Sequence, residues 1–200
     1  MTASLLGLAA VFLVLVWQVQ TGGVLVVLDG IVNAGLAPWR TRAPLAAFAW
    51  LTQVGTGAAG AAIALAASGL LWSGGRLALV GPLWLTFIGA QATTWSLKFV
   101  TARVRPPFLE GVTAGSPSFP SAHATVSVAI YGFLALAIAQ GLPEQARAWV
   151  FGAAGLLIAL ICFSRLFLSL HYLTDVLAGG VVAAAWLVLG WRLARGWGPG

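Results

Sequence analysis

Long apolar stretches, interrupted by single charged residues, run through this 200-residue chain and restrict its fold more than any other feature. Only 7% of the residues are charged, whereas about 25% are charged in a typical soluble domain. A helix of about 20 apolar residues crosses the hydrocarbon core of a bilayer. Because several stretches reach that length, the sequence predicts an all-α, polytopic membrane protein.

Charged residues and prolines delimit six predicted transmembrane helices. These helices lie at about 3–19, within 44–72, at about 77–97 and 121–142, between 147 and 165, and between 175 and 192. The segment 24–39 is shorter and carries Asp29, Asn33 and Pro38, so we expect a short interfacial helix after the first span. The first span lacks a cationic leader and a clear cleavage site, and we interpret it as retained rather than as a signal peptide. Residues 1–200 are therefore predicted to form a single integral-membrane domain.

Charge and cysteine content argue against two other kinds of function. The formal net charge is +6, but the ten cations are scattered between apolar stretches and form no basic run. We therefore expect no binding of nucleic acid. Cys162 is the only cysteine, which excludes a disulfide within the chain and a cysteine metal site.

Three short polar blocks interrupt the apolar pattern and contain both histidines and the only lysine. They read Lys98-x6-Arg105-Pro106, Pro120-Ser121-Ala122-His123 and Ser164-Arg165-x5-His171-x3-Asp175. The first two blocks follow the third predicted span, and the last block follows the fifth. Two spans lie between these loops, so both loops emerge on the same side of the membrane. The predicted number of spans therefore brings all three blocks to one site.

The last block combines an imidazole with a carboxylate. His171 and Asp175 are four residues apart and share a face if the sixth span begins at this point. A carboxylate beside an imidazole fixes its tautomer and leaves the other nitrogen free as a nucleophile. Arg165, at the end of the fifth span, can reach the same point across the short loop. Taken alone, this block also fits an ordinary polar start of a helix.

The middle block opens the fourth span. A helix N-terminus presents free backbone N–H groups and the positive end of the helix dipole, which suit a phosphate. Ser121 can cap this terminus or donate its hydroxyl to a phosphate oxygen, and both roles are compatible. His123 lies within the first turn, where it can pass a proton to a leaving group.

The first block supplies cations. The residue before a proline avoids helical geometry, so we expect the helix to end before Arg105. Lys98 and Arg105 can still converge on one anion. Arg103 lies on a different face from Lys98, and we expect it to contact lipid headgroups. Taken singly, each of these cations also fits interfacial snorkelling.

The remaining acidic residues do not form a cluster. Asp29, Glu110 and Glu144 are isolated in the sequence, whereas hard cations need several oxygen ligands. The two imidazoles, three cations and one carboxylate of the blocks suit an attack on a phosphate ester. Because the other acidic residues are isolated, we expect this chemistry to proceed without a metal ion.

In this order, the three blocks resemble the signature of the type-2 phosphatidic acid phosphatase (PAP2) superfamily, which reads K-x6-RP, PSGH and SR-x5-H-x3-D. The resemblance extends from Lys98 to Asp175 and covers the third to sixth spans. Its one departure is Ala122, where the family usually has glycine. The alanine methyl group can crowd the backbone approach to phosphate, but it removes no catalytic group. Residues 118–119 and 171–179 also resemble bacterial members.

The resemblance implies a role for each matching residue. His171 is the nucleophile that forms a phosphohistidine, and Asp175 orients and supports it. His123 protonates the departing oxygen and then activates water. The residues expected to hold the phosphate are Lys98, Arg105, Ser121, Ala122 and Arg165. The catalytic core covers about 77–192.

The implied function is that of a metal-independent lipid phosphate phosphatase without a cofactor. Expected substrates are undecaprenyl pyrophosphate, phosphatidylglycerol phosphate or phosphatidic acid. The expected location is the bacterial inner membrane, with the site facing the periplasm. A lipid phosphotransferase and a non-catalytic transporter or binding protein remain alternatives, whereas the apolar composition argues against a soluble vanadate haloperoxidase. The sequence leaves the oligomeric state open.

Overall fold

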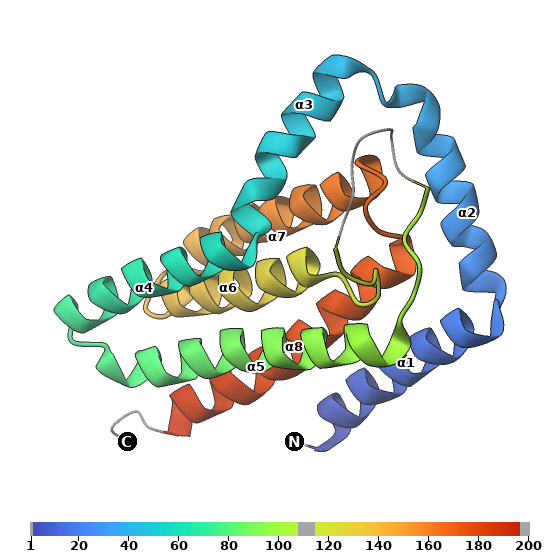
Figure 1. The fold of residues 1–200 in the computed structure, drawn as a ribbon. Coiled ribbons are helices and arrows are strands. Elements are labelled where there is room, and N and C mark those ends of the chain that lie inside the picture. The colour runs from blue at the N-terminus through green and yellow to red at the C-terminus, as the bar shows by residue number, and fades with distance from the viewer. Residues whose placement is uncertain (1, 108–114, 197–200) are drawn as a thin grey trace.

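The computed structural model describes residues 2–107 and 115–196, and within these ranges its regular elements are all helices (Figure 1). The eight α-helices are α1 (Thr2–Thr21), α2 (Val24–Leu36), α3 (Arg42–Leu51), α4 (Gly57–Ser73), α5 (Val80–Thr101), α6 (Ala122–Ala139), α7 (Glu144–Phe167) and α8 (Leu173–Gly196). Three 3₁₀ turns lie in the connections from α2 to α5, namely η1 (Ala37–Trp39), η2 (Thr52–Gly55) and η3 (Leu77–Leu79). The predicted all-α class is confirmed, as is a short helix directly after the first span.

Five of the helices in the described part of the chain are long and apolar enough to cross a membrane. A sixth span is obtained only if α3–η2 and α4 are counted together, and this pair is bent by 49°. The bend lies at Thr56, which is extended (φ −72°, ψ 155°) and accepts a hydrogen bond from the Ala59 N–H at 3.2 Å. The second predicted span is therefore a broken one, because an N-cap between Gly55 and Gly57 starts a new helix.

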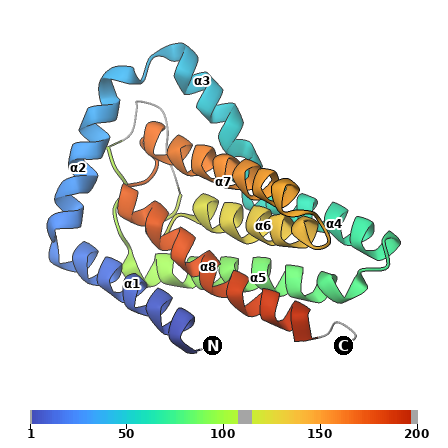
Figure 2. The same ribbon diagram turned by 180° about the vertical axis from the view of Figure 1, so that it is seen from behind.

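Helix α6 occupies the centre of the bundle and packs against α4, α5, α7 and α8. Helix α1 lies against the outer side of α8. Helices α2 and α3 form an arch at one end of the bundle, as the two opposite views show (Figures 1 and 2). The core between α4, α5 and α6 contains fully buried apolar side chains, including Leu83, Ile130 and Phe133.

Two glycines allow α8 to lie close to its neighbours. A Cβ atom at Gly179 would be 2.4 Å from the Ser121 carbonyl oxygen, and one at Gly190 would be 2.0 Å from the Thr86 Oγ1. Helices in a membrane pack through small residues of this kind because apolar side chains gain little there by leaving lipid. The contact at Gly179 sets the distance between α8 and the start of α6.

One end of the bundle collects the segments that carry the three polar blocks. These segments are the end of α5, the start of α6, the end of α7 and the start of α8 (Figure 1). The backbone N–H of Ser121 donates to the Asp175 carbonyl oxygen at 2.9 Å, which joins the second block to the third. The prediction that the blocks lie together is confirmed.

We expect the Gly179→Ala substitution to lower the melting temperature of the purified protein in detergent. The new methyl group would collide with backbone at Ser121, and overpacking of this kind costs about 1–3 kcal/mol. Gly180→Ala is the matched control, because a Cβ at Gly180 would have no atom of another helix within 4 Å. Equal melting temperatures for the two variants would contradict the close approach of α8 to α6.

Candidate active site

His171 lies in the tight connection between α7 and α8. The carbonyl oxygen of Arg165 accepts hydrogen bonds from the N–H groups of Leu170 and His171, at 3.0 and 3.2 Å. Ser169 takes a left-handed conformation (φ 53°) that turns the chain back. His171 is consequently held within the protein, and only 4% of its surface is exposed.

The carboxylate of Asp175 faces one nitrogen of this ring. Asp175 Oδ2 lies 3.3 Å from His171 Nδ1 and accepts the Tyr172 N–H at 2.9 Å. The expected pairing of the two residues is confirmed, but the expected shared helical face is wrong. Helix α8 begins at Leu173, so His171 precedes the helix and Asp175 lies in its first turn. With Nδ1 protonated toward the carboxylate, Nε2 keeps its lone pair.

Arg105 lies on the other side of the ring. Its Nη1 is 3.3 Å from His171 Nε2 and donates to the Leu170 carbonyl oxygen at 2.7 Å. Its Nε donates to the Ser116 carbonyl oxygen at 2.8 Å. Helix α5 ends before this residue, as predicted, because Ala102 adopts a left-handed conformation (φ 46°). The guanidinium is thereby fixed beside the free nitrogen of His171.

Burial lowers the pKa of both His171 and Arg105. The pKa of His171 falls to about 3, mainly because burial disfavours the imidazolium, while the hydrogen bond and charge of Asp175 act in the opposite direction. Burial also lowers the pKa of Arg105, against the charge of Asp175. His171 is therefore neutral at physiological pH, and its Nε2 lone pair is not protonated.

Lys98 is buried at the end of α5, with 1% of its surface exposed. Its Nζ donates to the carbonyl oxygens of Pro117 and Ser118, at 2.6 and 3.3 Å. The ammonium thus orders the segment that leads into the second block, and it lies within electrostatic reach of Arg105, Asp175 and Arg165.

Two buried polar atoms at this site have no hydrogen-bond partner among the described residues. They are Ser121 Oγ and Arg165 Nε. Ser121 is fully buried and is the N-cap residue of α6, but its side chain makes no capping hydrogen bond, so its hydroxyl remains available as a donor. Arg165 is 6% exposed and uses Nη1 to donate to Thr52 Oγ1 at 2.9 Å. Unpaired buried donors are costly, and both would be satisfied by an oxyanion.

His123 reaches the same region from the first turn of α6. It is half-buried, and its neighbour Ala122 is the first residue of that helix. The ring lies within electrostatic reach of His171 and of the three cations named above. With Arg165, it lines a cavity of about 570 Å³. The rest of the border consists of apolar residues of α3 and of the α7–α8 connection, together with the polar residues Thr52, Gln53 and Thr56.

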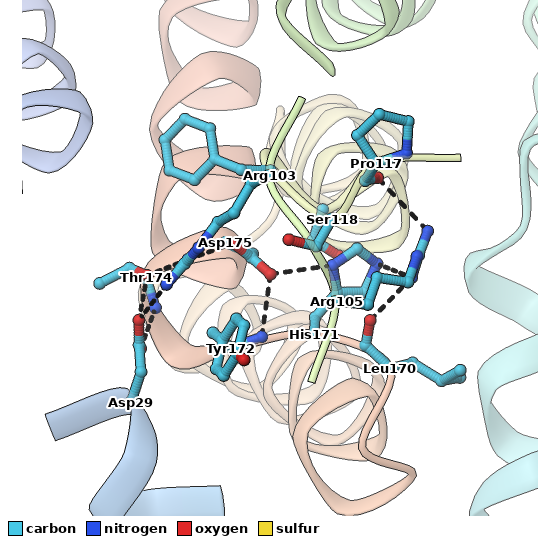
Figure 3. A network of polar contacts seen from close by, with 12 residues as sticks. Asp29, Arg103, Arg105, Pro117, Ser118, Leu170, His171, Tyr172, Thr174 and Asp175 are labelled. Carbon is cyan, nitrogen blue, oxygen red and sulfur yellow. Dashed lines mark hydrogen bonds and ion pairs between the residues drawn. The ribbon is translucent and has the colours of Figure 1, made fainter. Parts of the chain in front are cut away.

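Figure 3 shows a part of the site that the sequence analysis missed. Arg103 does not face lipid headgroups as expected. Its Nη1 lies 2.5 Å from Asp175 Oδ1 and its Nη2 lies 2.8 Å from Asp29 Oδ2. Asp29 is not isolated either, because it also accepts hydrogen bonds from Thr174. The available signal was a carboxylate within an apolar helix, which requires a cation. Glu110 lies outside the described residues.

The sequence profile of the PAP2 superfamily matches residues 79–198, and the chain belongs to this superfamily. Phosphatidylglycerophosphatase B of Bacillus subtilis (strain 168) is 36% identical over 85 residues. That match covers 42% of this chain and 42% of the relative.

The fold is similar to the crystal structure of a transmembrane PAP2-type phosphatidylglycerolphosphate phosphatase from Bacillus subtilis. The TM-score is 0.87, at 23% sequence identity and over 97% of each chain. The similarity establishes the fold of a multi-pass membrane protein for this chain.

We expect the His171 ring not to titrate between about pH 5 and pH 8, because its pKa is lowered to about 3 from the usual value of about 6.5. The chain has two histidines, so a His123→Gln variant labelled with ¹³C-histidine reports His171 alone. Its ring carbon shifts should remain constant in the folded protein and should titrate in denaturant. A midpoint near neutral pH in the folded protein would contradict a buried, neutral imidazole.

Proposed function

We propose that this protein is a metal-independent lipid phosphate phosphatase that acts through a phosphohistidine on His171. The observation that carries the proposal is the pair of unpartnered buried donors, Ser121 Oγ and Arg165 Nε, in a region that also holds Lys98 and Arg105. A phosphate group carries enough acceptor oxygens to satisfy all four side chains. Family membership supports the same conclusion.

In the first step, His171 Nε2 attacks phosphorus and forms an N–P bond while the bond from phosphorus to the lipid oxygen breaks. Asp175, at 3.3 Å from Nδ1, stabilises the positive charge that the ring acquires. His123, as an imidazolium, gives its proton to the departing oxygen and becomes neutral. The cations and the hydroxyl of Ser121 stabilise the charge on the phosphoryl oxygens.

In the second step, water attacks phosphorus and the N–P bond breaks. His123, neutral after the first step, accepts the proton of this water. Phosphate leaves and His171 regains its neutral form. The buried position of the ring keeps other nucleophiles from the phosphoenzyme.

The cavity at His123 and Arg165 supports a lipid substrate. Its apolar border includes Leu45 and Ala49 of α3 and Leu168 beyond α7. A lipid chain can occupy this space while its phosphate meets the cations. The name of the Bacillus relative favours phosphatidylglycerol phosphate over undecaprenyl pyrophosphate and phosphatidic acid.

We also propose that the site faces the outside of the inner membrane. The opposite end of the bundle carries four cations, Arg76, Arg147, Arg192 and Arg195. At the site end, Arg103 is paired with carboxylates, which leaves Arg40 and Arg42 outside the phosphate site. Four cations against two favour the opposite end as cytoplasmic.

An impermeant maleimide tests this orientation in whole cells. In a Cys162→Ser background, a Val104→Cys variant should be labelled from outside, because Val104 is 82% exposed at the site end. A Gln145→Cys variant at the other end should react only after the membrane is permeabilised. The reverse pattern would place the site in the cytoplasm.

The function is tested by phosphate release from purified protein with the three lipid phosphates, in the presence and absence of EDTA. We expect highest turnover with phosphatidylglycerol phosphate and no effect of the chelator. His171→Ala should reduce kcat by more than about 10³-fold. Full turnover by this variant, or transfer of the phosphate to an added lipid instead of water, would contradict the proposal.

His123→Ala separates the two steps. With a lipid phosphate, whose leaving group needs a proton, we expect a loss of about 10²–10⁴-fold. With p-nitrophenyl phosphate, whose leaving group needs none, the first step should continue and acid-labile phosphohistidine should accumulate. If neither substrate, labelled with ³²P, leaves label on the protein, this result would argue against the phosphohistidine intermediate.

A further inference from the structure

Asp29 and Arg103 form a buried charge network with Asp175, on the side of the His171 ring opposite Arg105 (Figure 3). Asp29 is 1% exposed and Asp175 is fully buried. The Arg103 guanidinium carbon also lies 4.3 Å from the centre of the Tyr172 ring. Asp29 belongs to α2, outside the segment 79–198 that matches the family profile.

The two oxygens of Asp175 have separate partners. Oδ1 faces Arg103 Nη1 at 2.5 Å. Oδ2 faces His171 Nδ1 at 3.3 Å and the Tyr172 N–H at 2.9 Å. Arg103 therefore fixes the orientation in which the carboxylate meets His171.

This arrangement creates an electrostatic difficulty that Asp29 resolves. An Arg103–Asp175 pair alone would be neutral, and Asp175 would offer little net charge to the His171 ring. Arg105 and Arg165 already act on the His171 ring as cations. With Asp29 2.8 Å from Arg103 Nη2, the three-residue network has a net charge of −1. In a buried region this charge acts on the nearby ring with little screening.

We propose that Asp29 and Arg103 are positioning residues for Asp175. Arg103 aims the carboxylate at His171, and Asp29 offsets the charge of Arg103 so that Asp175 stabilises the ring when it becomes positive. The inference rests on the proposed role of His171 as the nucleophile. It assigns a role in the reaction to α2, because Asp29 belongs to this helix. Asp29 acts through Arg103 rather than by direct contact with the phosphate.

A purely mechanical role is the competing explanation. Asp29 accepts hydrogen bonds from the Thr174 N–H at 2.9 Å and from Thr174 Oγ1 at 2.6 Å, and it thereby attaches α2 to the start of α8. Loss of any of these hydrogen bonds would weaken the attachment of α2 to α8, whereas the electrostatic role of Asp29 depends on its charge.

Asp29→Asn removes the charge and keeps an oxygen for the Thr174 N–H. We expect kcat to fall by about 10- to 100-fold, the range found when the outer partners of metal-ligating histidines are replaced. KM should change little, because the phosphate contacts are untouched. Glu144→Gln is the matched control, because it makes the same chemical change at an exposed residue at the other end of the bundle, and it should retain the kcat of the wild type.

Two further variants distinguish charge from attachment. Thr174→Val keeps all three charges and loses the hydroxyl contacts, so its kcat should remain well above that of Asp29→Asn. The double variant Asp29→Asn/Arg103→Met restores the net charge of −1, so its kcat should exceed that of Asp29→Asn. A double variant at or below the single variant, or Thr174→Val as impaired as Asp29→Asn, would overturn the proposal.

The same series separates this inference from the proposed function. If His171→Ala is inactive while Asp29→Asn keeps the wild-type kcat, the inference fails and the function stands. If His171→Ala turns over, the function itself fails. If Asp29→Asn does not give a monodisperse, cooperatively melting protein, the double variant is compared with the wild type and with Asp175→Asn. A kcat as low as that of Asp175→Asn would then overturn the proposal.

Discussion

The energetic cost of keeping charged groups away from water governs this structure. A bundle made of apolar helices can bury Lys98, Arg165 and Asp175 only where each has a partner or awaits one. Lys98 is satisfied by backbone oxygens and Asp175 by Arg103 and His171. Arg165 Nε and Ser121 Oγ are left unpaired, and under the proposed function they mark the place where the phosphate binds.

The residues of the candidate site lie at helix ends rather than in helix interiors. The backbone near each end has hydrogen-bonding groups that the helix does not use, and these fix the site. The Arg165 carbonyl oxygen holds the His171 loop, and the Asp175 carbonyl oxygen holds the start of α6. The close approach at Gly179 keeps α6 and α8 in register, so that packing in the membrane and geometry at its surface are coupled.

The sequence predicted the spans and the gathering of the three blocks because both follow from hydropathy and from the parity of membrane crossings. It did not predict the break at Thr56, because a run of small apolar residues is compatible both with one continuous helix and with two helices joined by a bend. The sequence predicted that Arg103 contacts lipid headgroups and that Asp29 has no acidic neighbour, and it did not predict their ion pair because 74 residues separate the two. Pairing over that distance depends on how α2 crosses the end of the bundle, which no local pattern specifies. The roles of His171 and His123 remain predictions.

The bent segment before α4 has an evolutionary consequence. Six residues that border the cavity, from Leu45 to Thr56, precede the first residue of the family match, whereas His123 and Arg165 lie within it. Under the proposed function, most residues that border the lipid chain therefore precede the family match, whereas the groups proposed to react lie within it, together with Leu168 and Leu170. Under the same proposal, substitutions in the first stretch would alter lipid preference and leave the reacting groups unchanged.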